Sequence, residues 1–140
     1  MPGPRKRYQE FIEFLTVFVS ELNDLALEGA VVLVEGKRDR DALTELGYNG
    51  RVITKASLHS ERGIATLRGV KLAVILTDLD EEGRRLAGRY AEFFALRGIE
   101  ASLTQRKRLM KASHGTFLHV ENLSRFAPAV PEIIATSSKI

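Results

Sequence analysis

The stretch of residues 72–85 limits the possible folds more than any other part of the chain. It opens with the continuous apolar run Leu72–Leu76. Such a run predicts a strand buried on both faces, as in a parallel sheet. Asp78 and Asp80 follow where this strand should end, and acidic residues from Glu81 onward suit the start of a helix because of its dipole. The stretch therefore predicts a buried strand, an acidic turn and a helix.

A second stretch repeats this pattern earlier in the chain. The apolar run Val31–Val34 ends in Glu35, and Gly36 then permits a tight turn before another helix. If the two strands are parallel neighbours, Glu35, Asp78 and Asp80 meet at one edge of the sheet. Ligand sites of open α/β sheets lie at that edge.

These carboxylates allow two interpretations. Clustered carboxylates repel one another and attract a cation, and they are the hard oxygen ligands that magnesium prefers. Glu35, Asp78 and Asp80 are therefore candidate metal ligands and catalytic groups, with Glu35 either a ligand or the general acid/base. Alternatively, Asp78 and Asp80 only cap the following helix, which is a common role for Asp.

The two stretches together resemble a known domain family. A hydrophobic strand ending in Glu35–Lys37, followed by a strand ending in Thr77–Gly83 with the pattern Thr-Asp-x-Asp-x-Glu-Gly, is similar to the TOPRIM domain. The resemblance covers Ala30–Leu103, with a weaker echo in His119–Asn122. This chain departs from many TOPRIM proteins at Lys55–Ser57, where they carry a glycine.

The resemblance implies a fold and an activity. The implied fold is a TOPRIM-like α/β domain with a mainly parallel four-stranded sheet flanked by helices. The implied cofactor is Mg²⁺ or Mn²⁺, held by Glu35, Asp78 and Asp80, and the implied partner is RNA or DNA. Among TOPRIM proteins, the chain resembles a small ribonuclease that matures ribosomal RNA, so a magnesium-dependent nuclease is the leading expectation. A non-catalytic nucleic-acid-binding TOPRIM module is the alternative.

Basic side chains accompany the predicted strand ends. Five of them lie within a few residues of those ends and are candidate contacts to a phosphate backbone: Lys37, Arg38, Lys55, Arg84 and Arg85. The alternative for each is an ordinary solvated charge. The basic run Arg106–Arg108, with Lys111, could extend this surface.

The predicted domain organisation has three parts. Residues 1–29 form a basic lead-in, Pro2–Arg7, and an amphipathic helix from Tyr8 to Leu27. Residues 30–126 form the TOPRIM domain, and residues 127–140 form a tail. The helix carries an apolar stripe wider than one packing neighbour requires. Part of its face, formed by Phe11, Phe14 and Phe18, is therefore expected at a homodimer or partner contact as well as on the core.

Further elements follow from local patterns. A second strand is predicted at Arg51–Thr54 and a fourth at Ile99–Leu103, with a helix over Ser57–Leu67 between the second and third strands. A short fifth strand is predicted at Phe117–Val120. The alternation of strands and helices favours parallel βαβ units.

Composition excludes several classes of site. The 140 residues contain no Cys and only three His, which excludes disulfides and thiolate metal sites and disfavours a His-rich zinc site. The net charge of +3 and the pI near 9.4 are compatible with nucleic-acid binding. No apolar segment is long enough to span a membrane and no signal peptide is apparent, so a cytoplasmic location is expected.

The sequence disfavours three other chemistries. An Asp-x-Asp pair after a strand also occurs in haloacid-dehalogenase-like phosphatases, but Glu82 stands where those enzymes usually carry Thr or Val. His114 and His119 have no partner visible in the sequence, which disfavours a catalytic role for either. No tyrosine sits in a recognisable topoisomerase context, which disfavours strand passage through a tyrosyl intermediate.

Overall fold

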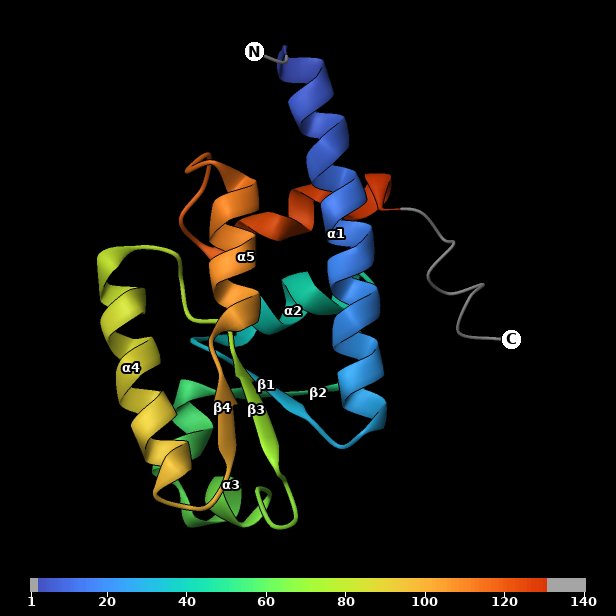
Figure 1. The fold of residues 1–140 in the computed structure, drawn as a ribbon. Helices are drawn as coiled ribbons and strands as arrows, with labels where there is room; N and C mark the ends of the chain where they lie inside the picture. Colours follow the sequence, from blue (N-terminus) through green and yellow to red (C-terminus); the bar gives the residue numbers. More distant parts are fainter. Residues whose placement is uncertain (1–2, 131–140) are drawn as a thin grey trace.

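A parallel four-stranded sheet forms the centre of the protein (Figure 1). The computed structural model describes residues 3–130. The strand order is β2-β1-β3-β4, and all three neighbouring pairs are parallel. The strands are β1 (Val31–Val34), β2 (Arg51–Thr54), β3 (Leu72–Ile75) and β4 (Glu100–Ser102). This confirms the predicted α/β class with a parallel sheet, flanking helices and an added N-terminal helix.

The two central strands are the apolar runs of the sequence. Every residue of β1 is buried, and β3 is buried from Ala73 onward. In the register of the sheet, Val31 lies opposite both Arg51 of β2 and Ala73 of β3. Because β1 and β3 are adjacent, parallel and in close register, they end at the same edge of the sheet.

Helices cover both faces of the sheet. Within residues 3–130, five are α-helical and two are 3₁₀ segments: α1 (Pro4–Leu27), α2 (Lys37–Glu45), η1 (Lys55–His59), α3 (Glu61–Ala65), α4 (Glu81–Ala95), α5 (Thr104–Ser113) and η2 (Val120–Ala129). Among residues 3–130, no helix is both long and apolar enough to cross a membrane.

Successive side chains of β1 and β3 point to opposite faces of the sheet, and an apolar core lies on each face. Val32 and Val74 face a core shared with α1, α2, α5 and η2. Leu33 and Ile75 face the opposite core, which contains side chains from η1 and α4 together with Leu67. Full burial of an aliphatic side chain contributes about 1.5–3 kcal/mol. The central strands are therefore held from both sides, which fixes the position of their carboxyl ends.

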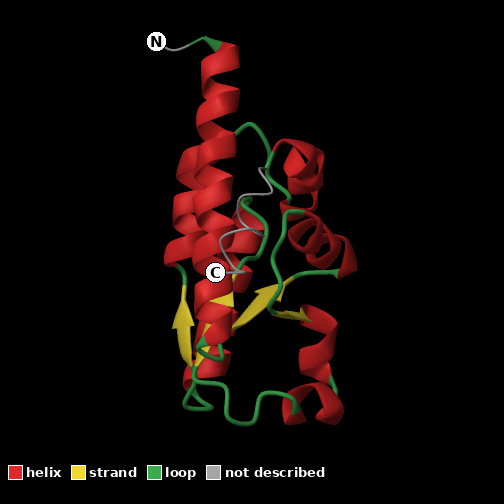
Figure 2. Ribbon diagram, turned by 90° about the vertical axis from the view of Figure 1, so that its right-hand side faces the viewer, coloured by secondary structure: helices red, strands yellow, loops and turns green. Residues whose placement is uncertain are grey.

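Helix α1 begins earlier than predicted. The expected lead-in over residues 2–7 is helical from Pro4, because proline at the first helical position already has a helical φ and needs no N–H partner. The first turns of α1 project beyond the neighbouring elements (Figures 1 and 2). Further along, Phe11 and Phe18 are buried in the core of the chain, and Phe14 packs partly buried against that core. Packing within the chain thus occupies most of this aromatic face.

Two local predictions were wrong. The helix expected over Ser57–Leu67 is divided into η1 and α3, with Ser60 capping α3 through a hydrogen bond from Gly63 N–H to its Oγ. The expected fifth strand at Phe117–Val120 is irregular up to His119, and Val120 begins η2. The anticipated boundary between residues 126 and 127 falls inside η2, and residues 131–140 of the predicted tail lie outside the described residues.

Candidate active site at the carboxyl edge of the sheet

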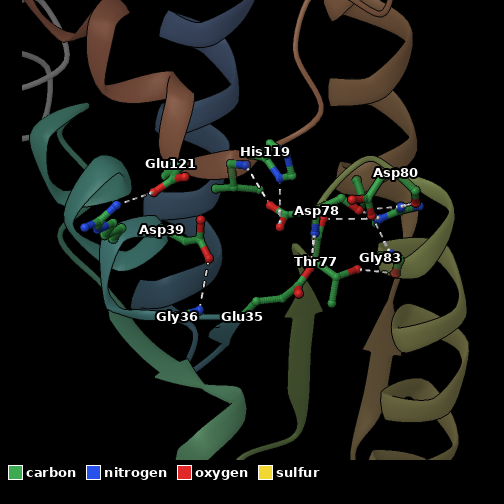
Figure 3. Close-up of polar contacts among 12 residues, drawn as sticks. Glu35, Gly36, Asp39, Thr77, Asp78, Asp80, Gly83, His119 and Glu121 are labelled. Atoms are coloured by element: carbon green, nitrogen blue, oxygen red, sulfur yellow. Dashed lines mark hydrogen bonds and ion pairs between the residues drawn. The ribbon is translucent and has the colours of Figure 1, made fainter.

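Glu35 and Asp78 meet at the carboxyl ends of β1 and β3 (Figure 3). The backbone N–H of Asp78 donates a 2.7 Å hydrogen bond to Glu35 Oε2. The chain passes from β1 outward to β2 and then returns to β3 on the other side of β1, so the strand order reverses between β1 and β3. Crevices of open α/β sheets form at such reversal points. The prediction that Glu35 and Asp78 share one edge is confirmed.

The carboxylate of Asp78 holds the start of η2 against this edge. Asp78 Oδ1 accepts a 2.9 Å hydrogen bond from the N–H of Val120, and Oδ2 lies 3.3 Å from His119 Nδ1. The side chain of Asp78 is only 17% exposed, whereas that of His119 is 51% exposed. The hydrogen bond and charge of Asp78 raise the pKa of His119. Both oxygens of Asp78 therefore contact groups of the protein.

Asp80 is turned toward helix α4. Its Oδ1 accepts a 2.7 Å hydrogen bond from the N–H of Gly83, which makes Asp80 the N-cap of α4. The hydroxyl of Thr77 donates a 2.6 Å hydrogen bond to the carbonyl of the same glycine. A Cβ at position 83 would overlap the carbonyl of Asp78, so only glycine allows this close approach. The capping interpretation is confirmed for Asp80 but not for Asp78.

A buried arginine holds the acidic turn, residues 77–80, through backbone carbonyl oxygens of that turn. Arg106 is 4% exposed, and its guanidinium donates hydrogen bonds to the carbonyl oxygens of Thr77, Asp78 and Asp80. Burial lowers the pKa of Arg106, while the charges of Asp80, Glu35 and Asp78 act in the opposite direction. The predicted role of Arg106 in a basic surface run was wrong, because α5 turns this side chain inward.

A depression of about 460 Å³ lies beside the Glu35–Asp78 pair, lined by Glu35, Gly36, Lys37, Arg38, Asp39, Asp78 and Glu121. Asp39 is buried, and its Oδ2 accepts a 2.9 Å hydrogen bond from Gly36 N–H. Burial raises the pKa of Asp39. Burial also raises the pKa of Glu35, with a further contribution from the charge of Asp78. The depression thus carries carboxyl groups that bind protons more readily than free ones.

The predicted basic residues divide into two groups. Lys37 and Arg38 line the depression, and Arg38 lies 3.9 Å from the carboxylate of Glu121. The charge of Lys55 lowers the pKa of Glu35, so this lysine also acts on the site. Arg84 and Arg85 instead lie on the exposed face of α4, where Arg84 forms a 2.6 Å ion pair with Glu81.

The fit of a metal ion rests on Glu35 and Asp78. Within residues 3–130, no three His, Asp or Glu side chains converge as a ready metal site. Glu35 and Asp78 nevertheless supply two neighbouring hard oxygen donors, which is the number of carboxylates that magnesium commonly takes. The raised pKa of Glu35 reflects in part the repulsion that a cation would relieve.

Four residues of this site were not assigned to it from the sequence: Asp39, Arg106, His119 and Glu121. The weaker resemblance to the TOPRIM family at His119–Asn122 was a signal that could have identified His119 and Glu121. Asp39 is the third residue of α2, where a side chain reaches back to the N-cap amide. No local sequence pattern predicted the burial of Arg106, because its neighbours Lys107 and Arg108 are also basic and are exposed.

Comparison with known proteins places this chain in a family. No protein-family model matches it. A UPF0292 protein of Methanosarcina acetivorans is 37% identical over 120 residues, which span 83% of this chain and 81% of that protein. A UPF0292 protein of Methanocaldococcus jannaschii is 31% identical over 119 residues, covering 84% of this chain and 92% of the relative.

A solved structure agrees with the fold. A protein of Aquifex aeolicus is 28% identical, superposes with a TM-score of 0.64, and is covered over 94% of its length by 75% of this chain. The similarities to the Methanosarcina acetivorans and Methanocaldococcus jannaschii proteins, which extend over most of both chains, show that the chain belongs to the UPF0292 family.

Proposed function

We propose that this protein is a magnesium- or manganese-dependent nuclease of TOPRIM type that acts on RNA or DNA phosphodiesters. The observation that carries the proposal is the pairing of Glu35 with Asp78 at the carboxyl ends of two adjacent parallel strands. It is the arrangement expected from the two sequence motifs. A cytoplasmic location belongs to the same proposal.

Glu35 is the group best placed to move a proton. Its Oε2 accepts the hydrogen bond from Asp78 N–H, so Oε1 is the oxygen that can exchange a proton with substrate. Its raised pKa brings the carboxyl closer to the operating pH, which favours general acid/base catalysis. In its alternative role, Glu35 would hold a divalent ion together with Asp78, and that ion would supply the positive charge that stabilises a developing phosphoryl charge.

The basic residues at the edge would hold the phosphate backbone. Lys37, Arg38 and Lys55 lie on or near the depression that contains Glu35. Phosphate contacts of this kind position a nucleic acid without reading its sequence. Arg84 is a weaker contact than its charge suggests, because Glu81 already neutralises it.

The decisive test is a cleavage assay on structured RNA, single-stranded DNA and plasmid, with and without magnesium or manganese. Glu35→Gln should abolish metal-dependent cleavage and leave nucleic-acid binding intact. Glu45→Gln, an exposed carboxyl at the end of α2, serves as the matched control and should cleave normally. A normal cleavage rate for Glu35→Gln would refute the catalytic assignment.

A second function has its own supporting observation. The carboxylates of Asp78 and Asp80 already accept hydrogen bonds from Val120 and Gly83, as structural carboxylates do. A non-catalytic nucleic-acid-binding module would keep these contacts and need no metal. Binding of the same substrates without cleavage by any metal-loaded sample would favour this alternative.

A partner contact through α1 completes the proposal. Val17 is 53% exposed on this helix, whereas Phe11 and Phe18 are buried in the core. A dimer through α1 would therefore centre on the exposed side near Val17. Sedimentation of the wild type and Val17→Glu would distinguish this dimer from a monomer.

A further inference from the structure

A second pocket lies away from the carboxylates, between the first turns of α1, the end of α5 and η2. Its volume is about 300 Å³, at the lower end of the range for small-ligand pockets. The side chains that line it include Arg7, Tyr8, Phe11, His114, Arg125 and Phe126. The lining thus combines aromatic rings with cationic side chains and includes no acidic residue.

The aromatic part of the pocket has a buried base and an exposed rim. Phe11 and Phe126 pack edge to face at 5.0 Å and are 8% and 7% exposed. The ring of Tyr8 lies 5.9 Å from that of Phe126 but is 49% exposed. A half-exposed ring supported by buried rings is a suitable platform for stacking an unpaired base.

The charges of the pocket favour an anion. Arg7 and Arg125 are exposed, and no carboxylate among residues 3–130 forms an ion pair with either. The guanidinium of Arg125 lies 4.9 Å from the centre of the Phe126 ring, so charge and aromatic surface are adjacent. A ligand with both a flat ring and a phosphate would match both features.

A histidine lies at the rim of the same pocket. His114 ends α5 in the left-handed conformation, with φ 52° and ψ 30°, which is a common way to end a helix. Its exposed side chain is a further polar group available to a ligand.

We infer that this pocket binds one nucleotide of a single-stranded nucleic acid, with its base stacked on Tyr8 and its phosphate between Arg7 and Arg125. The inference rests on the proposed nucleic-acid function and adds a subsite to it. Thr116 of the pocket precedes His119 by three residues, a span of at most about 11 Å. Since His119 contacts Asp78, a strand leaving the pocket could continue toward the carboxylate edge.

Binding of a labelled ten-nucleotide single-stranded RNA, followed by fluorescence anisotropy in EDTA, tests the subsite without cleavage. Tyr8→Ala should weaken binding at least about fivefold, the effect of losing one stacked base. Tyr8→Phe should bind within about twofold of wild type. Arg7→Ala and Arg125→Ala should each reduce the slope of log affinity against log salt, by about one. Arg62→Ala, an exposed arginine of α3, is the matched control.

The outcomes separate the subsite from the active site. Unchanged affinity in Tyr8→Ala, equal affinity for a duplex of the same length, or no binding by the wild type would overturn the subsite. If Tyr8→Ala weakens binding while no sample ever cleaves, the subsite stands and the proposed nuclease activity fails. If cleavage depends on Glu35 but Tyr8→Ala binds as tightly as the wild type, the nuclease activity is supported and the subsite is refuted. Unchanged thermal unfolding of each variant establishes that its fold is intact.

Discussion

Asp78 and Val120 lie 42 positions apart in the sequence and are joined by a 2.9 Å hydrogen bond from the amide of Val120 to Asp78 Oδ1. The same carboxylate is a proposed metal ligand. Metal binding and the attachment of η2 therefore both depend on the side chain of Asp78. An ion at this edge would share Asp78 with η2 or displace Val120 from it.

Magnesium or manganese should raise the thermal midpoint of the protein. An ion that binds only the native state contributes about 2.7 kcal/mol at one hundred times its Kd. Asp78→Asn combined with Asp80→Asn should remove this response, because an amide is a poor magnesium ligand. The apo double variant should remain folded, since each Asn oxygen can still accept the Val120 or Gly83 hydrogen bond. Asp41→Asn, exposed on α2, is the control for calorimetry, and a persisting metal response in the double variant would place the ion elsewhere.

Arg106 should contribute far more stability than its neighbour on the same helix. Arg106→Ala leaves the carbonyls of the acidic turn without their donor, and we expect a loss of about 2–4 kcal/mol in urea unfolding. Arg106→Lys should recover part of this loss by keeping the charge. Arg108 forms a 2.6 Å ion pair with Glu21 that is about 40% exposed, so Arg108→Ala should cost less than about 1 kcal/mol. Similar losses for the two alanine variants would contradict the positioning role of Arg106.

Two glycines of α4 should respond to alanine in opposite directions. At Gly83 the new methyl group would overlap the Asp78 carbonyl, which should cost about 1–3 kcal/mol and displace the acidic turn. At Gly88 nothing lies within 4 Å of an added Cβ, and the better helix propensity of alanine should stabilise by about 0.5–1 kcal/mol. Chemical denaturation of both variants measures the difference. Equal effects at the two positions would show that the turn tolerates a side chain.

Asp39 should make stability depend on pH in a defined direction. Burial raises its pKa in the folded protein above the ordinary value of 3.8, so the folded state holds this proton more tightly than the unfolded state. Its contribution is therefore fully present below pH 3.8 and is lost as pH rises through the raised pKa. Asp39→Asn lacks this titration and can still accept from Gly36. The variant should be more stable than wild type at pH 7, and this advantage should shrink toward pH 4. An advantage independent of pH would exclude Asp39 as the titrating group.

The sequence predicted those parts of the site that depend on strand ends. Glu35 and Asp78 follow apolar runs, and parallel neighbouring strands bring such ends together. The orientation of Asp80 was not predictable, because the local sequence fits both a helix cap and a metal ligand. The burial of Arg106 depends on which face of α5 packs on the sheet, and this is decided by tertiary contacts rather than by the surrounding basic residues. The resemblance of the Glu35 and Asp78 motifs to TOPRIM remains a prediction of function.

The contacts among Glu35, Asp78 and Val120 join three separate parts of the chain. The stability of the site can therefore be measured apart from the stability of the sheet. The amide protons of Asp78 and Val120 are both held by carboxylates, whereas that of Leu76 is held by the Leu33 carbonyl within the sheet. Exchange of the first two protons with deuterium reports local opening of the edge, and exchange of the third reports disruption of the sheet. The logarithm of the protection factors of the Asp78 and Val120 amides, multiplied by RT, is the free energy that separates a protein with an assembled site from one that is still folded but has lost it.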